Sequence, residues 1–237
     1  MAALPLLRSY ALDRWFEAAG PAPEVFSAVT GAPTARVSAA GLDVAAMADH
    51  ARRVGGPALR RLTFHERAGL LKKLAVHLGD HKAALYALST DTGATKTDSW
   101  IDIDGGIATL HVFASKGRRE LPNETFLLDG AVEGLSKRGS FVGRHVFTSL
   151  RGVAVHVNAF NFPVWGLLEK LGPALLAGVP VIAKPATATA PLAEALARLV
   201  VESGILPAGA FQFVAGSVGA LLDHLTGQDV VSFTGSA

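Results

Sequence analysis

The 237-residue sequence contains no cysteine, and this absence removes several kinds of chemistry at once. Disulfide bonds, cysteine-bound zinc, iron–sulfur clusters and thiol nucleophiles cannot be built from these residues. Charge is also scarce, because 22 basic and 20 acidic residues leave a net charge of only +2 and no basic stripe. We therefore expect neither a nucleic acid nor an anionic membrane as a partner.

Targeting signals and long uninterrupted apolar runs are missing as well. The apolar start of the chain is interrupted by Arg8, too early for a secretory segment. The two longest uncharged stretches, 152–168 and 203–222, are broken by asparagine, proline or glycine, whereas a membrane-spanning helix needs about 20 mostly apolar residues. The eight histidines show no spacing typical of a metal site. The sequence thus predicts a cytoplasmic protein without a metal centre.

Half of the residues are hydrophobic, which is enough for a sizeable core and excludes a disordered chain. Near the N-terminus, segments 10–18 and 25–37 are broken by Gly/Pro clusters and predict a β-hairpin or a pair of edge strands. Thr63 and Glu66 have the spacing of a capping box, which marks the start of a helix. Apolar spacing predicts helices over 43–54, 66–78, 82–89 and 98–116.

The chain divides into three predicted parts. Residues 1–120 would form the hairpin and a helical part that packs on the last part of the chain. Residues 121–150 contain short strand-like pieces and predict an extended β arm. Because bare strand edges tend to pair, we expect this arm to join copies of the chain into a homo-oligomer. Residues 151–237 have a different texture and would form the first part of a Rossmann-type domain.

In this last part, apolar β-branched runs alternate with helical stretches. The predicted strands are 153–157, 179–183, 210–214 and 230–233. The predicted helices are 163–177, 191–203 with Glu194, Arg198 and Glu202 on its polar side, and a short one over 217–225. Such alternation predicts an α/β fold with a parallel, doubly wound sheet. Ligands of these sheets bind at the carboxyl ends of the strands, so the turns there are the candidate site.

The turns after the four predicted strands carry a carboxamide, a cation and small hydroxyl or glycine residues. Glycine and serine allow close backbone approach, helix N-termini favour anions, and lysine adds positive charge. Each residue type is common in turns, so the prediction depends on their joint position at one edge. The four turns are Asn158-Ala-Phe-Asn161-Phe-Pro163, Lys184-Pro-Ala-Thr187, Gly216-Ser217 and Thr234-Gly235-Ser236.

These turns and the helix after the first strand resemble the aldehyde dehydrogenase superfamily. The matching motifs are Asn-Phe-Pro at 161–163, Lys-Leu-Gly-Pro-Ala-Leu at 170–175, Lys-Pro at 184–185 and Phe-Thr-Gly-Ser at 233–236. The predicted hairpin, helices and arm fit the same layout, so the resemblance covers nearly the whole chain. Further motifs resemble one branch, the semialdehyde dehydrogenase domains of phenylacetate degradation and their benzoyl-CoA relatives. They lie at 102–106, 158–163, 184–190 and 229–237.

The resemblance implies the N-terminal portion of an oxidoreductase that converts an aldehyde to a carboxylic acid with NADP, NAD being possible. In this branch the aldehyde is a CoA-linked semialdehyde from ring degradation. Asn161 would supply the side-chain donor of the oxyanion hole. Lys170 matches a lysine of the active-site helix, either as a catalytic group or as the buried partner of a carboxylate. Phe162 would line the substrate tunnel.

The resemblance also assigns the cofactor contacts. Lys184 would bind the adenosine ribose or its phosphate, Gly235 and Ser236 the pyrophosphate, and Gly216 the adenine side; Phe160 is a further contact. Most NAD-preferring members carry glutamate where this chain has Thr187, and a carboxylate there would repel a 2′-phosphate. We therefore expect NADP to bind at least as well as NAD.

A second group of candidates lies in the predicted helix over 98–116. Asp102 and Asp104 lie two residues apart, which places them on different sides of a helix, so we interpret them as solvated residues or helix caps rather than metal ligands. Gly105 and Gly106 are costly in a helix, and we hypothesise that they widen the substrate tunnel for a long CoA-linked aldehyde. His156, inside the first predicted strand, is interpreted as a core residue with one satisfied nitrogen.

The family mechanism needs a cysteine nucleophile and a glutamate that activates water, and both follow the Phe-Thr-Gly-Ser turn in the family. Neither is found in this chain in that context, so we interpret the sequence as the N-terminal part of a longer protein and expect residues 1–237 alone to be inactive. The alternative is a short, non-catalytic nucleotide-binding or oligomerisation module.

Overall fold

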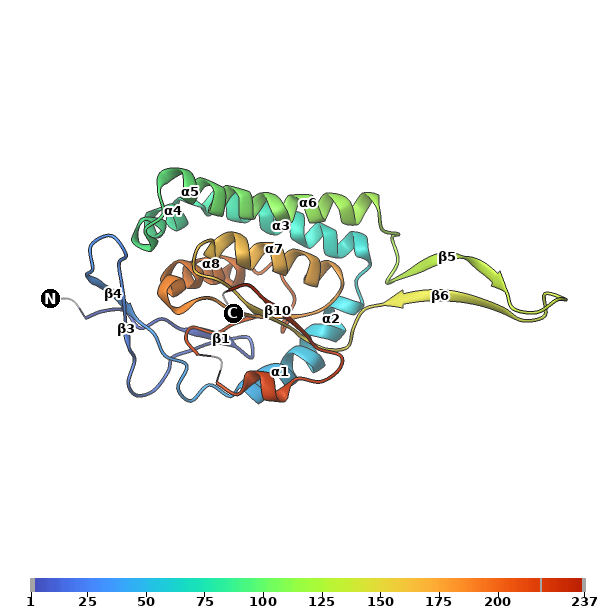
Figure 1. The fold of residues 1–237 in the computed structure, drawn as a ribbon, viewed down its shortest axis with the longest axis horizontal. Coiled ribbons are helices and arrows are strands. Elements are labelled where there is room, and N and C mark those ends of the chain that lie inside the picture. The colour runs from blue at the N-terminus through green and yellow to red at the C-terminus, as the bar shows by residue number, and fades with distance from the viewer. Residues whose placement is uncertain (1–2, 218, 236–237) are drawn as a thin grey trace.

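The computed structural model describes residues 3–217 and 219–235, and its centre is a six-stranded sheet (Figure 1). The strands follow the order β10-β7-β8-β9-β1-β2 across it. Four of them coincide with the predicted apolar runs and are parallel: β7 (Ala154–Val157), β8 (Val181–Lys184), β9 (Phe211–Phe213) and β10 (Val230–Phe233). The predicted α/β class with a parallel sheet is therefore confirmed.

Helices cover both faces of this sheet (Figure 1). On one face lie α7 (Pro163–Leu176) and α8 (Ala190–Glu202), and α3 (Phe64–His81) and α6 (Gly106–Arg119) pack outside α7. The opposite face carries α1 (Val44–His50). The shorter helical elements are η1 (Ala51–Gly55), α2 (Gly56–Arg60), α4 (Ala83–Ser89), η2 (Thr90–Thr92), α5 (Lys96–Trp100), η3 (Ile101–Gly105), η4 (Thr187–Thr189) and η5 (Leu221–His224).

Side chains of the parallel strands alternate between two cores, one on each face of the sheet. Ala154 and Val181 belong to the core under α7 and α8, whereas Val155 and Ile182 pack with Met47 of α1 on the other side. A strand that is buried on both faces needs apolar residues at every position. This requirement explains the unbroken apolar runs in the sequence.

The helices predicted before residue 120 are present, and those predicted over 66–78 and 98–116 extend beyond the predicted bounds at both ends. The capping box before α3 is formed, since Thr63 Oγ1 accepts from the Glu66 backbone and Glu66 accepts from the Thr63 backbone. The helix over 98–116 runs from Lys96 to Arg119 as α5, η3 and α6. One turn of π-helix, η3, interrupts it. Such turns are rare in proteins, and those that occur are often found at functional sites.

The N-terminal strands form two hairpins, whereas the sequence predicted that segments 10–18 and 25–37 form a single hairpin or a pair of edge strands. One hairpin joins β1 (Ser9–Ala11) to β2 (Arg14–Phe16), and the other joins β3 (Glu24–Phe26) to β4 (Pro33–Arg36). Leu12 and Asp13 make the first turn with positive φ angles. This conformation usually requires glycine or asparagine, so nothing in the sequence indicated the turn. β1 then pairs with β9 and extends the main sheet.

Two predictions about the last helices are wrong. The helix expected over 217–225 is a single 3-10 turn, η5, because Gly219 adopts a positive φ of 52° just before it. Glu194 was expected on the polar side of α8 but is only 6% exposed. Its carboxylate accepts from Arg198 at 2.5 Å, and the Arg198 guanidinium lies 4.9 Å from the centre of the Trp15 ring. Trp15 of β2 therefore lies beside Arg198, and residues of β3 and β4 line a cavity together with Glu194.

The predicted β arm is a two-stranded hairpin that projects from the body (Figure 1). β5 (Phe126–Gly134) and β6 (Val142–Thr148) pair only with each other. The arm exposes large apolar side chains: Leu128, Val132, Leu135, Phe141, Val142, Val146 and Phe147. No helix within the described residues is both long and apolar enough to cross a bilayer.

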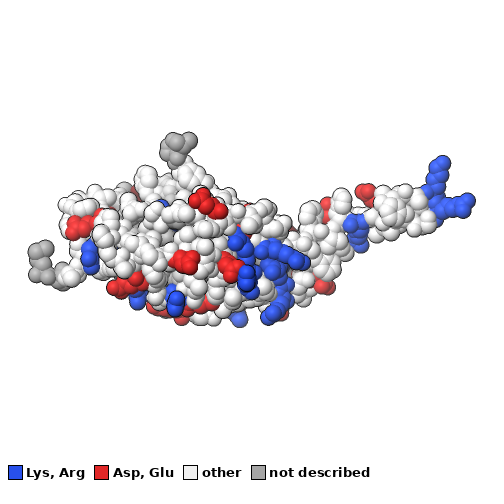
Figure 2. All heavy atoms as spheres, turned by 90° about the horizontal axis from the view of Figure 1, so that it is seen from below, with Lys and Arg blue, Asp and Glu red and all other residues white. Residues whose placement is uncertain are grey.

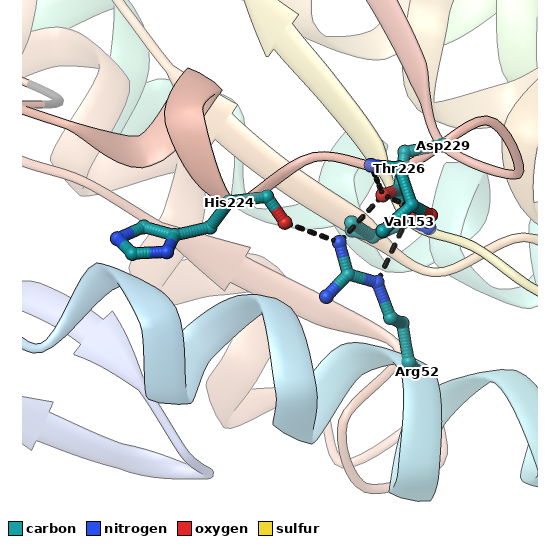
Figure 3. Close-up of polar contacts among 5 residues, drawn as sticks. All are labelled: Arg52, Val153, His224, Thr226 and Asp229. Atoms are coloured by element: carbon teal, nitrogen blue, oxygen red, sulfur yellow. Dashed lines mark hydrogen bonds and ion pairs between the residues drawn. The ribbon is translucent and has the colours of Figure 1, made fainter.

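Asp229, just before β10, ties this strand to the rest of the domain (Figure 3). Its carboxylate accepts from Arg52 Nε at 3.1 Å and Nη2 at 2.5 Å, and from the backbone amides of Val153 and Thr226. Arg52 also donates to the His224 carbonyl. Although burial raises the pKa of this carboxyl, the hydrogen bonds dominate and lower it to about 2.

Candidate functional site

The carboxyl ends of the parallel strands meet at one edge of the sheet, as predicted. Val157 of β7 is paired with Lys184 of β8 on one side and with Phe233 of β10 on the other. The turns are joined by backbone hydrogen bonds, from the Asn158 amide to the Lys184 carbonyl and from the Thr234 amide to the Val157 carbonyl, both 2.9 Å. Three of the four candidate turns are therefore neighbours.

Asn161 lies in the turn between β7 and α7 with an exposed side chain, at the wall of a cavity of about 230 Å³. Phe162 lines the same cavity, so two residues predicted for the reaction site lie together. The other lining residues are Ile101, Ala159, Trp165, Gly166, Glu169 and Thr234. A carboxamide in this position can donate to an oxygen atom of a small molecule in the cavity.

The start of α7, two residues after Asn161, is capped by a residue from another helix. Asp102 Oδ1 accepts from the backbone amides of Val164 at 3.0 Å and Trp165 at 2.7 Å. α7 has no capping side chain of its own, and Pro163 at its first position has no amide hydrogen. Asp102 is 3% exposed, and burial raises its pKa to about 6 against the opposing effect of the two amides.

The two aspartates of η3 are thus structural, as the sequence indicated; Asp102 is buried and Asp104 is partly exposed. Asp102 is a cap for α7 rather than for its own helix, and Asp104 accepts from Lys82 and from Tyr86. Among the described residues, no group of three or more His, Asp or Glu side chains is suited to a metal ion.

Gly105 and Gly106 do not leave open space, which contradicts the hypothesis that they widen the substrate tunnel. A methyl group on Gly105 would overlap the indole ring of Trp165, and one on Gly106 would lie 2.9 Å from the Trp165 Cα. The glycines therefore allow η3 and α6 to approach α7 closely, and this approach brings Asp102 to the α7 amides. The space in front of them is occupied by Trp165.

Lys170 is almost buried, with 9% of its side chain exposed, and it has a carboxylate partner. Its Nζ donates to Glu169 Oε1 and to the Gly166 carbonyl, both at 3.1 Å. Glu169 also accepts from Trp165 Nε1 at 2.8 Å. The sequence analysis singled out neither Glu169 nor Trp165, although the adjacent opposite charges of Glu169 and Lys170 in an apolar helix were a usable signal.

A second cavity of about 510 Å³ adjoins the first, and Glu169 and Thr234 line both. His156 of β7 and Lys170 of α7 both line it. Burial and the charge of Lys170 lower the pKa of His156 to about 4, so this imidazole is neutral at pH 7. The histidine is in the core, as predicted, but its Nδ1 has no partner among the described residues. The side-chain Nδ2 and Oδ1 atoms of buried Asn158 also have no hydrogen-bond partner among the described residues.

The predicted cofactor residues differ in their surroundings. Lys184 ends β8 half-buried, burial lowers its pKa, and no described acidic residue pairs with it. Thr187 is exposed at the start of η4, and Phe160 is 66% exposed. Gly216 has a φ of 122°, and a methyl group there would lie 3.0 Å from the Ala39 amide nitrogen.

The cofactor-binding roles of these residues stay predictions. Close packing against residue 39 accounts for Gly216 without a ligand. Gly235 is exposed two residues after the end of β10, next to the edge that carries Lys184. Ser236 lies outside the described residues. An uncompensated lysine beside exposed turns nevertheless has the chemistry of a phosphate site.

Residues 15–237 match the sequence profile described as the aldehyde dehydrogenase family. The chain is 47% identical to the 3,4-dehydroadipyl-CoA semialdehyde dehydrogenase of Aromatoleum evansii, over 98% of this chain and 45% of the relative. It is 32% identical to the NADP-dependent succinate-semialdehyde dehydrogenase GabD of Escherichia coli K12, over 98% of this chain and 47% of the relative. The chain thus spans about half the length of the curated relatives it matches.

Solved structures have the same fold. The lactaldehyde dehydrogenase of Escherichia coli superimposes with a TM-score of 0.80 at 25% identity, over 93% of this chain and 45% of the other. An NADP-dependent Escherichia coli enzyme gives a TM-score of 0.77 at 29% identity, over 92% and 44%.

Proposed function

This chain belongs to the aldehyde dehydrogenase family, and we propose that it supplies the oxyanion donor and the first cofactor contacts of an enzyme that oxidises an aldehyde to a carboxylic acid. The reaction consumes water and reduces NAD(P)+ to NAD(P)H with release of a proton. Because residues 1–237 contain no cysteine, the nucleophile would come from outside this segment. The chain would thus be the N-terminal portion of the enzyme.

The observation that carries this proposal is the position of Asn161, exposed at the wall of the 230 Å³ cavity. When a nucleophile adds to an aldehyde, the carbonyl oxygen becomes negative. The Asn161 amide would donate a hydrogen bond to that oxygen, and one such donor is typically worth about 3–4 kcal/mol in the transition state. Asp102 and the two glycines of η3 and α6 fix the helix that follows the donor.

Lys184, which has no acidic partner among the described residues, supports the cofactor assignment. Lys184 would bind the ribose phosphate, and the turn at Gly235 and Ser236 would bind the pyrophosphate; Phe160 and Gly216 would complete the contacts. Nicotinamide, when bound, supplies the acceptor for the hydride of the aldehyde. Thr187 presents no negative charge to a 2′-phosphate, which favours NADP.

The substrate class follows from the relative at 47% identity, which is named for a CoA-linked semialdehyde. We assign the same class of aldehyde to this protein. Phe162 would contact the aldehyde chain, since it lines the cavity beside Asn161. Lys170 would keep the Glu169 carboxylate in place between the two cavities. Because CoA esters and NADP are intracellular, we expect the enzyme to be cytoplasmic.

The proposal is tested with the complete protein that contains this chain. NADPH formation should require an aldehyde, and a CoA-linked semialdehyde should give a higher kcat/KM than succinate semialdehyde. Residues 1–237 alone should form no NADPH, because they contain no thiol nucleophile. Aldehyde-dependent NADPH formation by the isolated segment would contradict the proposal.

The cofactor preference is tested at Thr187. Thr187→Glu should weaken NADP binding by at least about ten-fold through repulsion of the 2′-phosphate and leave NAD binding within about three-fold. Thr187→Ser, which adds no charge, is the matched control. Ten-fold tighter binding of NAD than of NADP by the unchanged protein would contradict the NADP assignment.

A further inference from the structure

Three arginines meet where the arm joins the body, far along α7 from the Asn161 turn. Arg60 ends α2, Arg67 lies in α3, and Arg151 follows β6. They surround Ser149, which accepts from Arg67 Nη1 at 3.1 Å and lines a cavity together with Arg60 and Arg151. Figure 2 shows a group of Lys and Arg side chains at this junction.

The cavity at this junction has a volume of about 500 Å³, and both polar residues and two apolar ones, Phe126 and Val146, line it. Besides the two guanidinium groups, three hydroxyl groups line it, from Thr125, Thr148 and Ser149. Guanidinium and hydroxyl groups are the donors that proteins use for phosphate and carboxylate oxygens. No acidic residue is found among its lining residues.

Two of these arginines, Arg67 and Arg60, have buried donor atoms without a hydrogen-bond partner among the described residues, whereas Arg151 is exposed. Arg67 is 1% exposed, and its Nε and Nη2 have no hydrogen-bond partner among the described residues. Its guanidinium lies 4.5 Å from the centre of the Phe64 ring, and burial lowers its pKa to about 10. Arg60 Nη1 is likewise buried and unpaired, and burial and the charge of Arg151 lower the pKa of Arg60.

Some arginines elsewhere in the protein have acidic partners that the junction arginines lack among the described residues. Within the described residues, none of the three junction arginines forms an ion pair, whereas several arginines elsewhere do: Arg52 with Asp229, Arg53 with Asp49, and Arg198 with Glu194. Positive charges that are withdrawn from water without a counter-charge destabilise a fold. The junction therefore has an excess of positive charge, open donors and space for a ligand.

We propose that this cavity, the arm-base site formed by Arg60, Arg151, Thr125, Thr148 and Ser149, binds an oxyanion. The ligand carries a phosphate or a carboxylate group that accepts from Arg60 and Arg151. Arg67 contributes positive charge from behind Ser149 and keeps the Ser149 hydroxyl directed by its hydrogen bond. The site is separate from the Asn161 cavity, with which it shares no lining residue.

The test uses inorganic phosphate and acetate as probes of the complete protein, at constant ionic strength set with chloride. Binding is measured by calorimetric titration, and the melting temperature is followed in parallel. Phosphate or acetate should bind and raise the melting temperature of the unchanged protein. Arg60→Gln and Arg151→Gln should each weaken that binding by about ten-fold, and Arg53→Gln, which changes an exposed arginine, should leave it unchanged.

A second measurement, the stability of Arg151→Gln without an oxyanion, distinguishes a ligand-binding arginine from one that stabilises the fold. In chloride alone, Arg151→Gln should be at least as stable as the unchanged protein, because it removes repulsion between Arg151 and Arg60. Preference for phosphate would identify a phosphate-bearing ligand, and preference for acetate a carboxylate. Absence of binding by both probes, equal binding by Arg151→Gln, or destabilisation of that variant in chloride would overturn the proposal.

Discussion

At the scale of single residues, Asn161 is the side chain on which the proposed chemistry depends. Its side chain is exposed, so replacement should remove a donor without leaving a hole in the core. In the complete enzyme, Asn161→Ala should lower kcat about 10²–10³-fold and change the melting temperature little. Steady-state kinetics and thermal unfolding of the same preparations check this expectation.

Asn161→Asp is the companion variant, because it has the same shape but lacks the amide donor. It should lose at least as much activity as Asn161→Ala, since a carboxylate repels a developing oxyanion. Retention of more than a tenth of the activity by both variants would remove Asn161 from the oxyanion role.

At the scale of elements, the start of α7 depends on Asp102 of η3. Asp102→Ala removes the acceptor for the Val164 and Trp165 amides and should lower the free energy of unfolding by about 1–2 kcal/mol. Asp102→Asn keeps an oxygen at the position of Oδ1, which accepts both bonds, and removes a buried charge. Denaturant unfolding near pH 8 should therefore rank Asp102→Asn at or above the unchanged protein and Asp102→Ala below it.

The pH dependence of these variants follows from the raised pKa. Because the pKa of Asp102 is about 6 in the fold and lower when unfolded, its effect on stability is most favourable in acid and worsens as pH rises through 6. Asp102→Asn should remove that dependence. Equal destabilisation by both variants at every pH would show that the α7 amides do not need this acceptor.

Asp229 has the opposite pH dependence. Its pKa is held at about 2, so its contribution is complete above about pH 4 and is lost as pH falls toward 2. Asp229→Asn should cost about 2 kcal/mol at pH 7 and little near pH 2.5, as measured by urea unfolding. Asp49→Asn changes the carboxylate of an exposed ion pair and should have an effect below about 0.5 kcal/mol. A pH-independent loss in Asp229→Asn would refute this account.

At the scale of the whole molecule, the arm is the feature that a single copy leaves uncovered. Phe141 and Phe147 are 64% and 57% exposed, and the strands pair only with each other. Exposed apolar strands of this kind tend to bind another surface, so we predict that the arm joins copies of the protein. Phe141→Asp combined with Phe147→Asp should convert the complete protein to smaller species in light scattering coupled to size-exclusion chromatography.

Lys137→Asp is the control for this experiment, because it adds the same charge near the tip of the arm without removing an apolar side chain. It should leave the molecular mass unchanged. An unchanged mass in the double variant would show that the arm is not the contact between copies.

The sequence by itself determined the class of the fold and the edge at which the site lies. Apolar runs that alternate with helical spacing predict parallel strands, and parallel strands place the Asn161, Lys184 and Thr234 turns at one edge because all their carboxyl ends meet there. The capping box at Thr63 was readable for the same reason, since both of its partners lie within three residues. Local periodicity and local hydrogen bonds leave a direct trace in the sequence.

Only the tertiary structure decided the partners of residues that lie far apart in the chain. Asp102 caps a helix that begins 61 residues later, Gly105 and Gly106 leave room for Trp165 rather than for a substrate, and Arg67 reaches Ser149 across 82 residues. Nothing in the local sequence of either partner specifies such a contact. Packing of α6 against α7 brings Asp102 and the glycines to the start of α7, because burial of apolar surface fixes the helices and the polar side chains are carried with them.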